Sequence, residues 1–198
     1  DAVGVVVEVV PPTRIVFTYG FATGVPIPPG GSIVTIELEP HGAGTRLHLA
    51  HAFAETAPRD EHVQGWRYQL AVFGNVVANE ANADAPAKVD AWFRVWSEPD
   101  AAARERALAA LASPDVQFRD RFSLLDGLTD VLPHITAAQR FMPGMELRRD
   151  GDIRHCQGTV LADWTASGPD GQPRGRGTNV FVIGGDGKFT AVTGFWKA

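Results

Sequence analysis

The sequence predicts an α+β protein made of two domains. Residues 3–53 alternate between apolar and polar side chains, which is the pattern of half-buried β-strands. Over 63–77 the apolar residues recur every three or four positions, which indicates one stripe of an amphipathic helix. After Pro86 helical patterns come first and long strands close the chain. Two such cycles within 198 residues are typical of two small domains.

The strands of the first cycle are separated by turn-forming residues. "VGVVVEVV" leads into the turn Pro11-Pro12, and "RIVFTYGF" follows it. In "IVTIELE" the side chains of Val34, Ile36 and Leu38 share one face. A hairpin turn at "HGAG" should return the chain as the strand "TRLHLAHAF". The helix stripe that comes next consists of Val63, Trp66, Leu70, Phe73 and Val77.

A linker is expected at 80–87, because "NEANADAPAK" is poor in large apolar residues. It would separate a first domain, 1–79, from a second domain, 88–198. The second domain begins with two predicted helices. Their apolar positions are Val89, Trp92 and Trp96, and then Leu108 and Leu111.

The rest of the second domain is expected to be a strand, a helix and an antiparallel meander. The strand covers 116–122. Asp130 is the expected N-cap of the helix, because Pro133 lacks a backbone N–H and is tolerated only in the first turn. Three long strands, at about 153–165, 174–184 and 188–196, are joined by "PDGQP" and "GGDG" turns.

Composition excludes several classes of partner. The formal net charge is −5 and no basic run is present, so neither nucleic acid nor an acidic membrane surface is expected as a partner. No apolar run approaches the roughly 20 residues that span a bilayer. The single cysteine, Cys156, cannot form an internal disulfide, so a cytoplasmic location is expected. His48 and His51 are three residues apart on a strand, and no spacing predicts a metal site.

Asp120, in "VQFRDRFSLLDG", is the main candidate for chemistry. In a strand its side chain shares a face with Val116, Phe118 and Phe122, while Arg119 and the other flanking arginine face the opposite side. A carboxylate among apolar side chains is shielded from water, which is the environment of a general base. The other reading is structural: Asp120 caps a nearby backbone amide or pairs with a distant arginine.

The first domain resembles the C-terminal part of a START-like, helix-grip domain of the heat-shock-protein-90 ATPase activator type. The resemblance is carried by "VEVVPPTRIVFTYGF", "VTIELEPHGAGTRLHLAH" and "HVQGWRYQLAVF", and it covers about 1–79. It implies an antiparallel sheet with a long C-terminal helix. The strand and short helices that normally begin this fold are missing, so the domain is expected to be partial, either truncated or completed by another chain.

The second domain resembles SnoaL-like domains of the nuclear transport factor 2-like superfamily. The resemblance is carried by "AWFRVWSEPDAAARERAL", "PDVQFRDRF", "HITAAQRFMPG" and "RGTNVFVIGGDGKFTAVTGFW", over about 86–198. It implies a cone-shaped α+β barrel with a pocket at its open end. The superfamily contains isomerases, polyketide cyclases, epoxide hydrolases and members without chemistry, so the fold alone does not name a function.

The resemblance also implies roles for particular residues. It makes Asp120 the proton-abstracting base, Asn179 a donor to a developing oxyanion and His134 a possible third polar group in the pocket. The isomerase tyrosine on the first helix is absent, since both tyrosines lie in the first domain. Asp163 is the second carboxylate that an epoxide hydrolase of this type would need.

Several aromatic residues are the expected walls of the pocket. They are Trp92, Trp96, Phe118, Phe122 and Trp164. His155 would reach the pocket only if a bulge shifted the strand register, and Cys156 is expected to be a core thiol because it shares parity with Val160 and Trp164.

The function expected from these observations is the binding of one small, mostly apolar molecule, with cofactor-free acid/base chemistry of the isomerase, cyclase or hydrolase type if there is turnover. The alternative is a non-catalytic ligand-binding or dimerisation scaffold. A homodimer is expected in both cases, because an incomplete sheet edge and a broad sheet face both need to be covered.

Overall fold

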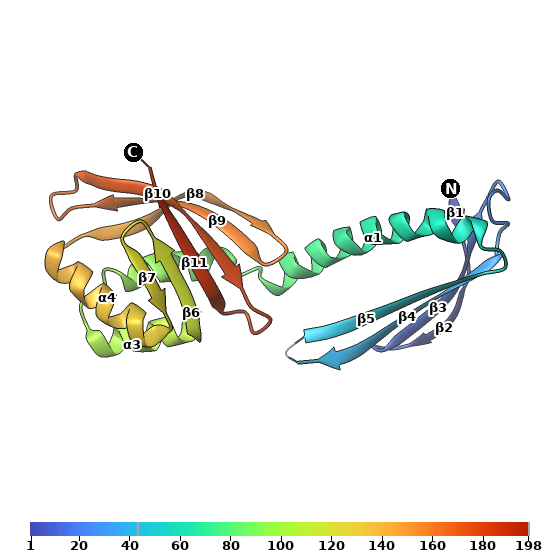
Figure 1. Cartoon of the computed structure of the whole chain (residues 1–198), viewed down its shortest axis with the longest axis horizontal. Coiled ribbons are helices and arrows are strands. Elements are labelled where there is room, and N and C mark those ends of the chain that lie inside the picture. The colour runs from blue at the N-terminus through green and yellow to red at the C-terminus, as the bar shows by residue number, and fades with distance from the viewer. Residues whose placement is uncertain (43, 198) are drawn as a thin grey trace. The chain divides into compact units, whose positions relative to one another are not determined.

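The computed structural model describes residues 1–42 and 44–197. The chain divides into two compact units, Asp1–Phe73 and Gly74–Ala198. Within the described residues, no helix has the length and apolar character needed to cross a membrane. The first unit has an antiparallel sheet and the second a mostly antiparallel one, and both sheets can be followed in Figure 1.

The first unit is a 5-stranded antiparallel sheet with the order β1-β3-β4-β5, in which β2 also pairs with β3. The strands are β1 (Ala2–Val3), β2 (Val6–Val10), β3 (Arg14–Phe21), β4 (Ser32–His41) and β5 (Gly44–Phe53). The predicted alternation is confirmed on β4, where Val34 is fully buried and Glu37 and Glu39 are exposed. Helix α1 (Ala57–Ala81) follows and has no fully buried residue.

A hydrogen-bonded chain joins α1 to this sheet. The Trp66 indole donates to His51 Nδ1 at 3.0 Å, and His51 Nε2 is 2.8 Å from Ser32 Oγ. An indole N–H only donates, so the His51 proton resides on Nε2 and is donated to Ser32, which in turn donates to the Tyr19 carbonyl at 3.0 Å. The His51 ring also lies edge-on to Tyr19 at 5.2 Å between centroids. The sheet and the helix are therefore held together by a neutral histidine.

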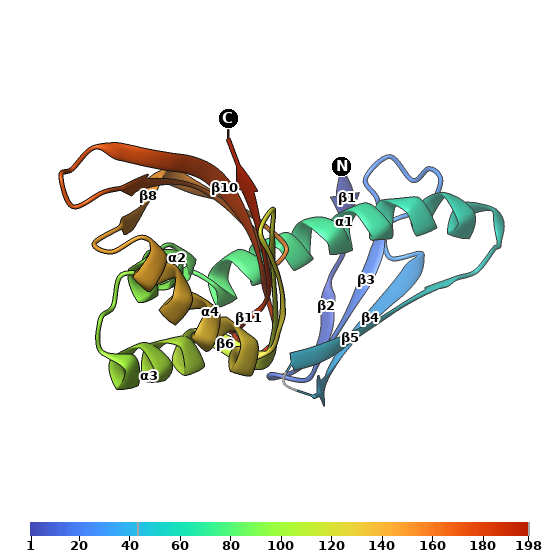
Figure 2. The ribbon, with the colours of Figure 1, turned by 60° about the vertical axis from the view of Figure 1, so that its left-hand side comes forward.

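Three helices of the second unit pack in the concavity of its sheet, as Figure 2 shows. They are α2 (Ala85–Val95), α3 (Ala101–Leu111) and α4 (Leu128–Phe141). The Asp100 carboxylate caps α3 by accepting from the Ala103 amide at 2.9 Å.

The expected start of α4, with Asp130 as the N-cap, is wrong by three residues. The N-cap is Gly127, which leaves the preceding strand with a φ of 81° that favours glycine. Pro133 therefore lies inside the helix rather than in its first turn. The Asp130 carboxylate accepts from the Asp126 amide at 3.2 Å, so it stabilises the residues just before the helix and does not cap the helix.

The sheet of the second unit has six strands in the order β7-β6-β11-β10-β9-β8. They are β6 (Ala112–Asp120), β7 (Ser123–Asp126), β8 (Glu146–Cys156), β9 (Thr159–Ser167), β10 (Pro173–Ile183) and β11 (Phe189–Trp196). β6 runs parallel to β11, and the other neighbours are antiparallel. Among the described strands β7 and β8 pair on one side only, so the sheet is curved but open and the expected cone-shaped barrel is wrong in that it does not close.

The single strand expected over 153–165 is two strands joined by a tight hairpin. Gln157 and Gly158 have φ values of 48° and 82°, which is the geometry of a two-residue hairpin turn. The turn breaks the parity argument, because Cys156 and Val160 lie on different strands. Cys156 is exposed and is not the core thiol that was expected.

The core of the second unit lies between the three helices and the concave face of the sheet. Trp92 is at its centre and is fully buried, with its ring edge-on to Phe181 and Phe189 at 6.0 Å in both cases. The predicted helix stripe is confirmed, since Val89 and Leu108 are also fully buried. This packing fixes α2 against the strands that carry the polar groups of the site.

Candidate functional site

A small apolar cavity lies between α2, the loop after α4 and the concave face of the sheet. Its volume is about 70 Å³. Its lining is mostly aromatic and aliphatic, with a carboxylate and an amide as the polar side chains: Phe93, Trp96, Phe118, Asp120, Met142, Met145, Leu147, Trp164, Ala166, Asn179, Gly194 and Trp196. Apolar walls with few convergent polar groups are the usual composition of a small-molecule site.

Asp120 reaches this cavity from the last position of β6. Strand parity holds up to this residue, because Val116 and Phe118 are buried on the same face and Arg119 turns away to pair with Asp126 at 2.6 Å. One carboxylate oxygen, Oδ1, accepts from the Phe122 amide at 2.8 Å. The other, Oδ2, accepts from the indole of Trp196 at 3.3 Å. No cation pairs with Asp120 within the described part of the chain.

Asn179 lies two strands away on β10 and is only 6% exposed. Its Oδ1 accepts from the Trp164 indole at 2.9 Å. Because an indole N–H can only donate, this contact fixes the orientation of the amide. The Asn179 Nδ2 group has no protein partner among the described residues, so its two N–H donors are free for a ligand.

Gly194 on β11 separates the two polar residues. It lies opposite Asn179 in the strand register. A Cβ added at Gly194 would be 3.1 Å from Asn179 Oδ1 and 3.3 Å from the Asp120 Cβ. Glycine in a strand marks a close approach of other groups, and here it keeps open the space between the carboxylate and the amide.

Two tryptophan rings hold the carboxylate and the amide in position. Trp164 and Trp196 are edge to face, with 4.9 Å between centroids and an interplanar angle of 86°. Gly177 and Gly175 make room for them: a Cβ at Gly177 would be 2.5 Å from the Trp164 ring, and one at Gly175 would be 2.9 Å from the Trp196 ring. Each ring uses its N–H to orient one polar side chain, so both groups are preorganised.

The structure brings together five of the nine residues singled out in the sequence. Asp120 and Asn179 line the cavity together with Trp96, Phe118 and Trp164. Trp92 does not, because it is buried in the core behind them.

Phe122 was expected on the inward face, and this is wrong. The strand ends at Asp120, and Arg121 and Phe122 form the turn to β7, so parity no longer applies. The Phe122 ring is 69% exposed and lies edge-on to Trp196 at 5.5 Å. Phe122 is therefore outside the cavity, beside its lining.

The remaining polar candidates also lie outside the cavity lining. His134 Nε2 is 3.1 Å from Ser123 Oγ, and its ring packs against Trp96 and Phe118. His155 pairs with Val160 across the hairpin and accepts from the Gly158 amide at 3.1 Å.

Asp163 faces the convex side of the sheet. The hydroxyl of Thr178 donates to it, and the Lys197 ammonium is 3.0 Å away. These contacts, the Thr178 hydrogen bond first and Lys197 second, hold the pKa of Asp163 below its usual value. It cannot act as a second carboxylate inside the cavity.

Sequence reasoning missed Met142, Met145 and Leu147, which line the cavity from the loop after α4 and the start of β8. Their positions depend on a loop without periodicity. Gly194 was also missed, although a glycine inside the apolar strand "FTAVTGFW" was a usable signal.

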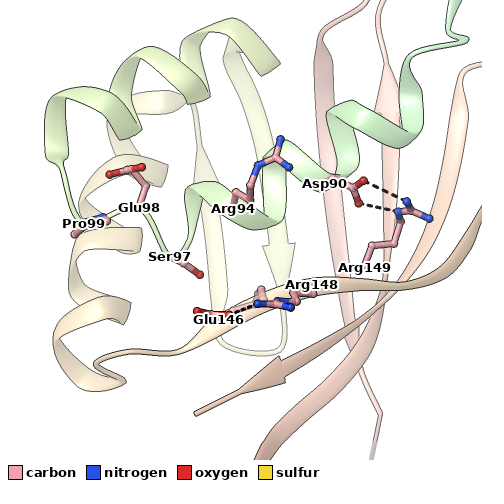
Figure 3. Close-up of a pocket in the computed structure, with 9 residues that line it drawn as sticks. Asp90, Arg94, Ser97, Glu98, Pro99, Glu146, Arg148 and Arg149 are labelled. Atoms are coloured by element: carbon pink, nitrogen blue, oxygen red, sulfur yellow. Dashed lines mark hydrogen bonds and ion pairs between the residues drawn. The ribbon is translucent and has the colours of Figure 1, made fainter. Parts of the chain in front are cut away.

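A second hollow in this unit is polar and open. It has a volume of about 540 Å³ and lies between α2, the α2–α3 connection and the first residues of β8 (Figure 3). Four of its six charged side chains are paired with one another: Asp90 pairs with Arg149 at 2.8 Å and Glu146 with Arg148 at 2.7 Å. We therefore place the candidate site in the apolar cavity. In the described residues there is no cluster of histidine, cysteine and acidic groups that could hold a metal ion.

The arrangement has the parts needed for proton transfer. A carboxylate without a counter-ion can accept a proton, and an adjacent amide N–H can stabilise negative charge that develops on a carbonyl oxygen. Apolar walls shield Asn179 from water, and Asp120 is half-buried beside it.

Comparison with known proteins gives a separate assignment for each unit. Residues 1–78 match the family model of the activator of Hsp90 ATPase homolog 1-like proteins. No curated protein matches the chain. A proposed isomerase of the SnoaL-like family from Agrobacterium tumefaciens strain C58 is similar at 20% identity and a TM-score of 0.55, over 57% of this chain and 96% of that chain.

Two further solved structures are similar at lower scores. A proposed polyketide cyclase from Sinorhizobium meliloti has 21% identity and a TM-score of 0.44, over 57% of this chain and 97% of that one. A SnoaL-like protein of unknown function from Burkholderia thailandensis has 14% identity and a TM-score of 0.48, over 59% and 97%. The protein thus joins a START-like domain that matches the Hsp90 ATPase activator homolog 1-like family, residues 1–78, to a domain with the SnoaL-like, nuclear transport factor 2-like fold.

Proposed function

We propose that the second domain binds a small, mostly apolar carbonyl compound in its cavity and transfers a proton with Asp120 as the base. The observation that carries the proposal is a carboxylate without a cation partner, set in an apolar cavity beside the free amide donors of Asn179.

The proposed step is proton abstraction from the carbon next to the carbonyl. Asp120 takes the proton, and the electron pair of the C–H bond moves to form the C=C bond of an enolate. The negative charge then resides on the former carbonyl oxygen, where an N–H of Asn179 can donate to it. Return of the proton from Asp120 to the same or another carbon completes an exchange or an isomerisation without any redox change.

Hydrogen–deuterium exchange tests this proposal. Butanone, cyclopentanone and γ-butyrolactone would be incubated with the protein in D₂O, and loss of the α-proton NMR signals would be followed. We expect exchange with wild type and a decrease of about 10²- to 10⁴-fold in Asp120→Asn, which keeps an acceptor for the Phe122 amide. Asn179→Ala should lower the rate by roughly 10²-fold.

The matched control is Asp126→Asn. It also removes a carboxylate from this hairpin, but Asp126 lies outside the cavity and pairs with Arg119. It should leave exchange unchanged. Equal exchange rates in wild type and Asp120→Asn would refute Asp120 as the base.

A ligand carrier without turnover is the second candidate. It is favoured by the hydrogen bond from the Phe122 amide to Asp120 Oδ1 at 2.8 Å, because this contact gives the carboxylate a structural task in the hairpin turn. Binding of the same compounds with no exchange above the solvent background would support the carrier.

A further inference from the structure

The cavity is too small to enclose a complete ligand of ordinary size. It has a volume of about 70 Å³, whereas pockets for drug-sized molecules are roughly 300–1,000 Å³. It can take the carbonyl end of a molecule between Asp120 and Asn179, but little more. Any larger ligand must extend past the residues at the mouth.

The mouth of the cavity carries apolar side chains that are open to solvent. Met142 lines the cavity and is 45% exposed. Trp196 also lines it and is half-buried, and the Phe122 ring lies edge-on to Trp196 at 5.5 Å with an interplanar angle of 78°. These three residues form what we call the mouth rim, which is continuous with the apolar lining.

Phe122 is held in place although it is exposed. Its backbone amide donates to Asp120 Oδ1 at 2.8 Å, and the Arg121 guanidinium lies 4.9 Å from the centre of its ring. A single exposed phenylalanine needs no explanation. Here, however, the backbone of Phe122 is held by the candidate base and its ring packs on a cavity-lining tryptophan, so a ligand that leaves the cavity meets an ordered apolar surface.

We infer that the ligand is elongated, with a carbonyl group in the cavity and an alkyl or aryl remainder lying on the mouth rim of Phe122, Trp196 and Met142. The inference rests on the proposed function for the carbonyl end and adds the substrate class and a specificity-determining residue, Phe122. The occupant of the rim is the apolar tail of the same small molecule.

A homologous series of ligands tests the inference. The dissociation constants of methyl ketones from butanone to 2-decanone would be measured by ligand-observed NMR. A fully buried methylene improves affinity by roughly 4-fold, so a methylene half-covered on an open rim should improve it by about 2-fold. We expect an affinity increase of roughly 30- to 100-fold across the series in wild type.

Phe122→Ser should reduce the increase of affinity with chain length, while the affinity for butanone stays within about 2-fold of wild type. The matched control is Leu124→Ser, which removes another exposed apolar side chain, 75% exposed, from the same hairpin. Leu124 points to the face opposite its neighbour Leu125, which packs against the core, whereas the Phe122 ring packs on Trp196. It should keep the full dependence of affinity on chain length.

The failure of the inference can be told from failure of the proposed function. Two outcomes would overturn the mouth rim and leave the proposed function standing. In the first, butanone binds but longer ketones bind no more tightly. In the second, affinity rises with chain length equally in wild type and Phe122→Ser. If no ketone of the series binds to wild type, both are overturned.

Discussion

Lowering the pH should destabilise the first domain through one histidine, His51. Its Nδ1 accepts from the Trp66 indole at 3.0 Å, and Nδ1 must stay unprotonated for this bond to exist. Burial, with the nearby His62 as the second cause, lowers the pKa of His51 from 6.5 to about 4. Protonation would break the contact between the sheet and α1.

The sign and size of the effect follow from these values. The unfolded chain takes up a proton at His51 as the pH falls below 6.5, whereas the folded domain does so only near 4. The stabilisation is therefore complete above pH 6.5 and is lost between pH 6.5 and 4. The full difference in pKa corresponds to roughly 3 kcal/mol, and because the ring is only partly buried we reduce it to about 1–1.5 kcal/mol.

Two measurements check this prediction. NMR titration of the imidazole signals should give a midpoint near 4 for His51, and urea unfolding at pH 7 and pH 4.5 should show the decrease in stability. His51→Gln should remove this part of the pH dependence. His48→Gln should not, because His48 is exposed and contacts the Glu39 carboxylate rather than α1. A His51 midpoint near 6.5 would refute the reasoning.

Four further outcomes are expected. Gly194→Ala should weaken ketone binding at least 10-fold at a cost of about 1 kcal/mol in thermal unfolding, because its Cβ enters the space between Asp120 and Asn179. Gly177→Ala should cost about 3 kcal/mol or more, since its Cβ would be 2.3 Å from a backbone carbonyl oxygen. Gly65→Ala should stabilise α1 by about 0.5–1 kcal/mol, because a Cβ there meets no atom within 4 Å. The proposed homodimer should give a light-scattering mass near twice 21.3 kDa, and a monomer mass at high concentration would contradict it.

Periodic patterns predicted the parts of the fold in which one face is buried along a whole element. The stripe of Val89 and Trp92 lies in the core because a helix turns through a constant angle per residue. Val116, Phe118 and Asp120 point to one side because strand side chains alternate. In both cases a local rule is enough, and no information on distant contacts is needed.

The errors occurred where a residue leaves such a regular element. Gln157 and Gly158 adopt positive φ and reverse the chain inside the stretch that was expected to be one strand. Because strand parity was extended across this turn, Cys156 was placed on the wrong side. Closure of the sheet failed as an expectation for a different reason. It depends on whether β7 and β8 meet, and neither sequence contains a signal for the strand that would lie beside it.

Asp120 lies in a regular strand and also at the end of that strand, and this position determines how its role must be tested. Parity brings its side chain to the cavity, but the strand also ends there, and the same carboxylate accepts from the Phe122 amide to close the turn. An alanine at this position would remove a turn contact and a base at once, so a loss of exchange could come from either. Asparagine keeps an oxygen for the Phe122 amide. It removes the charge, the ability to accept a proton and the hydrogen bond from the Trp196 indole, since its NH2 group would face that N–H. A loss of exchange in Asp120→Asn, with the turn intact by NMR, is therefore evidence for proton transfer rather than for the hairpin.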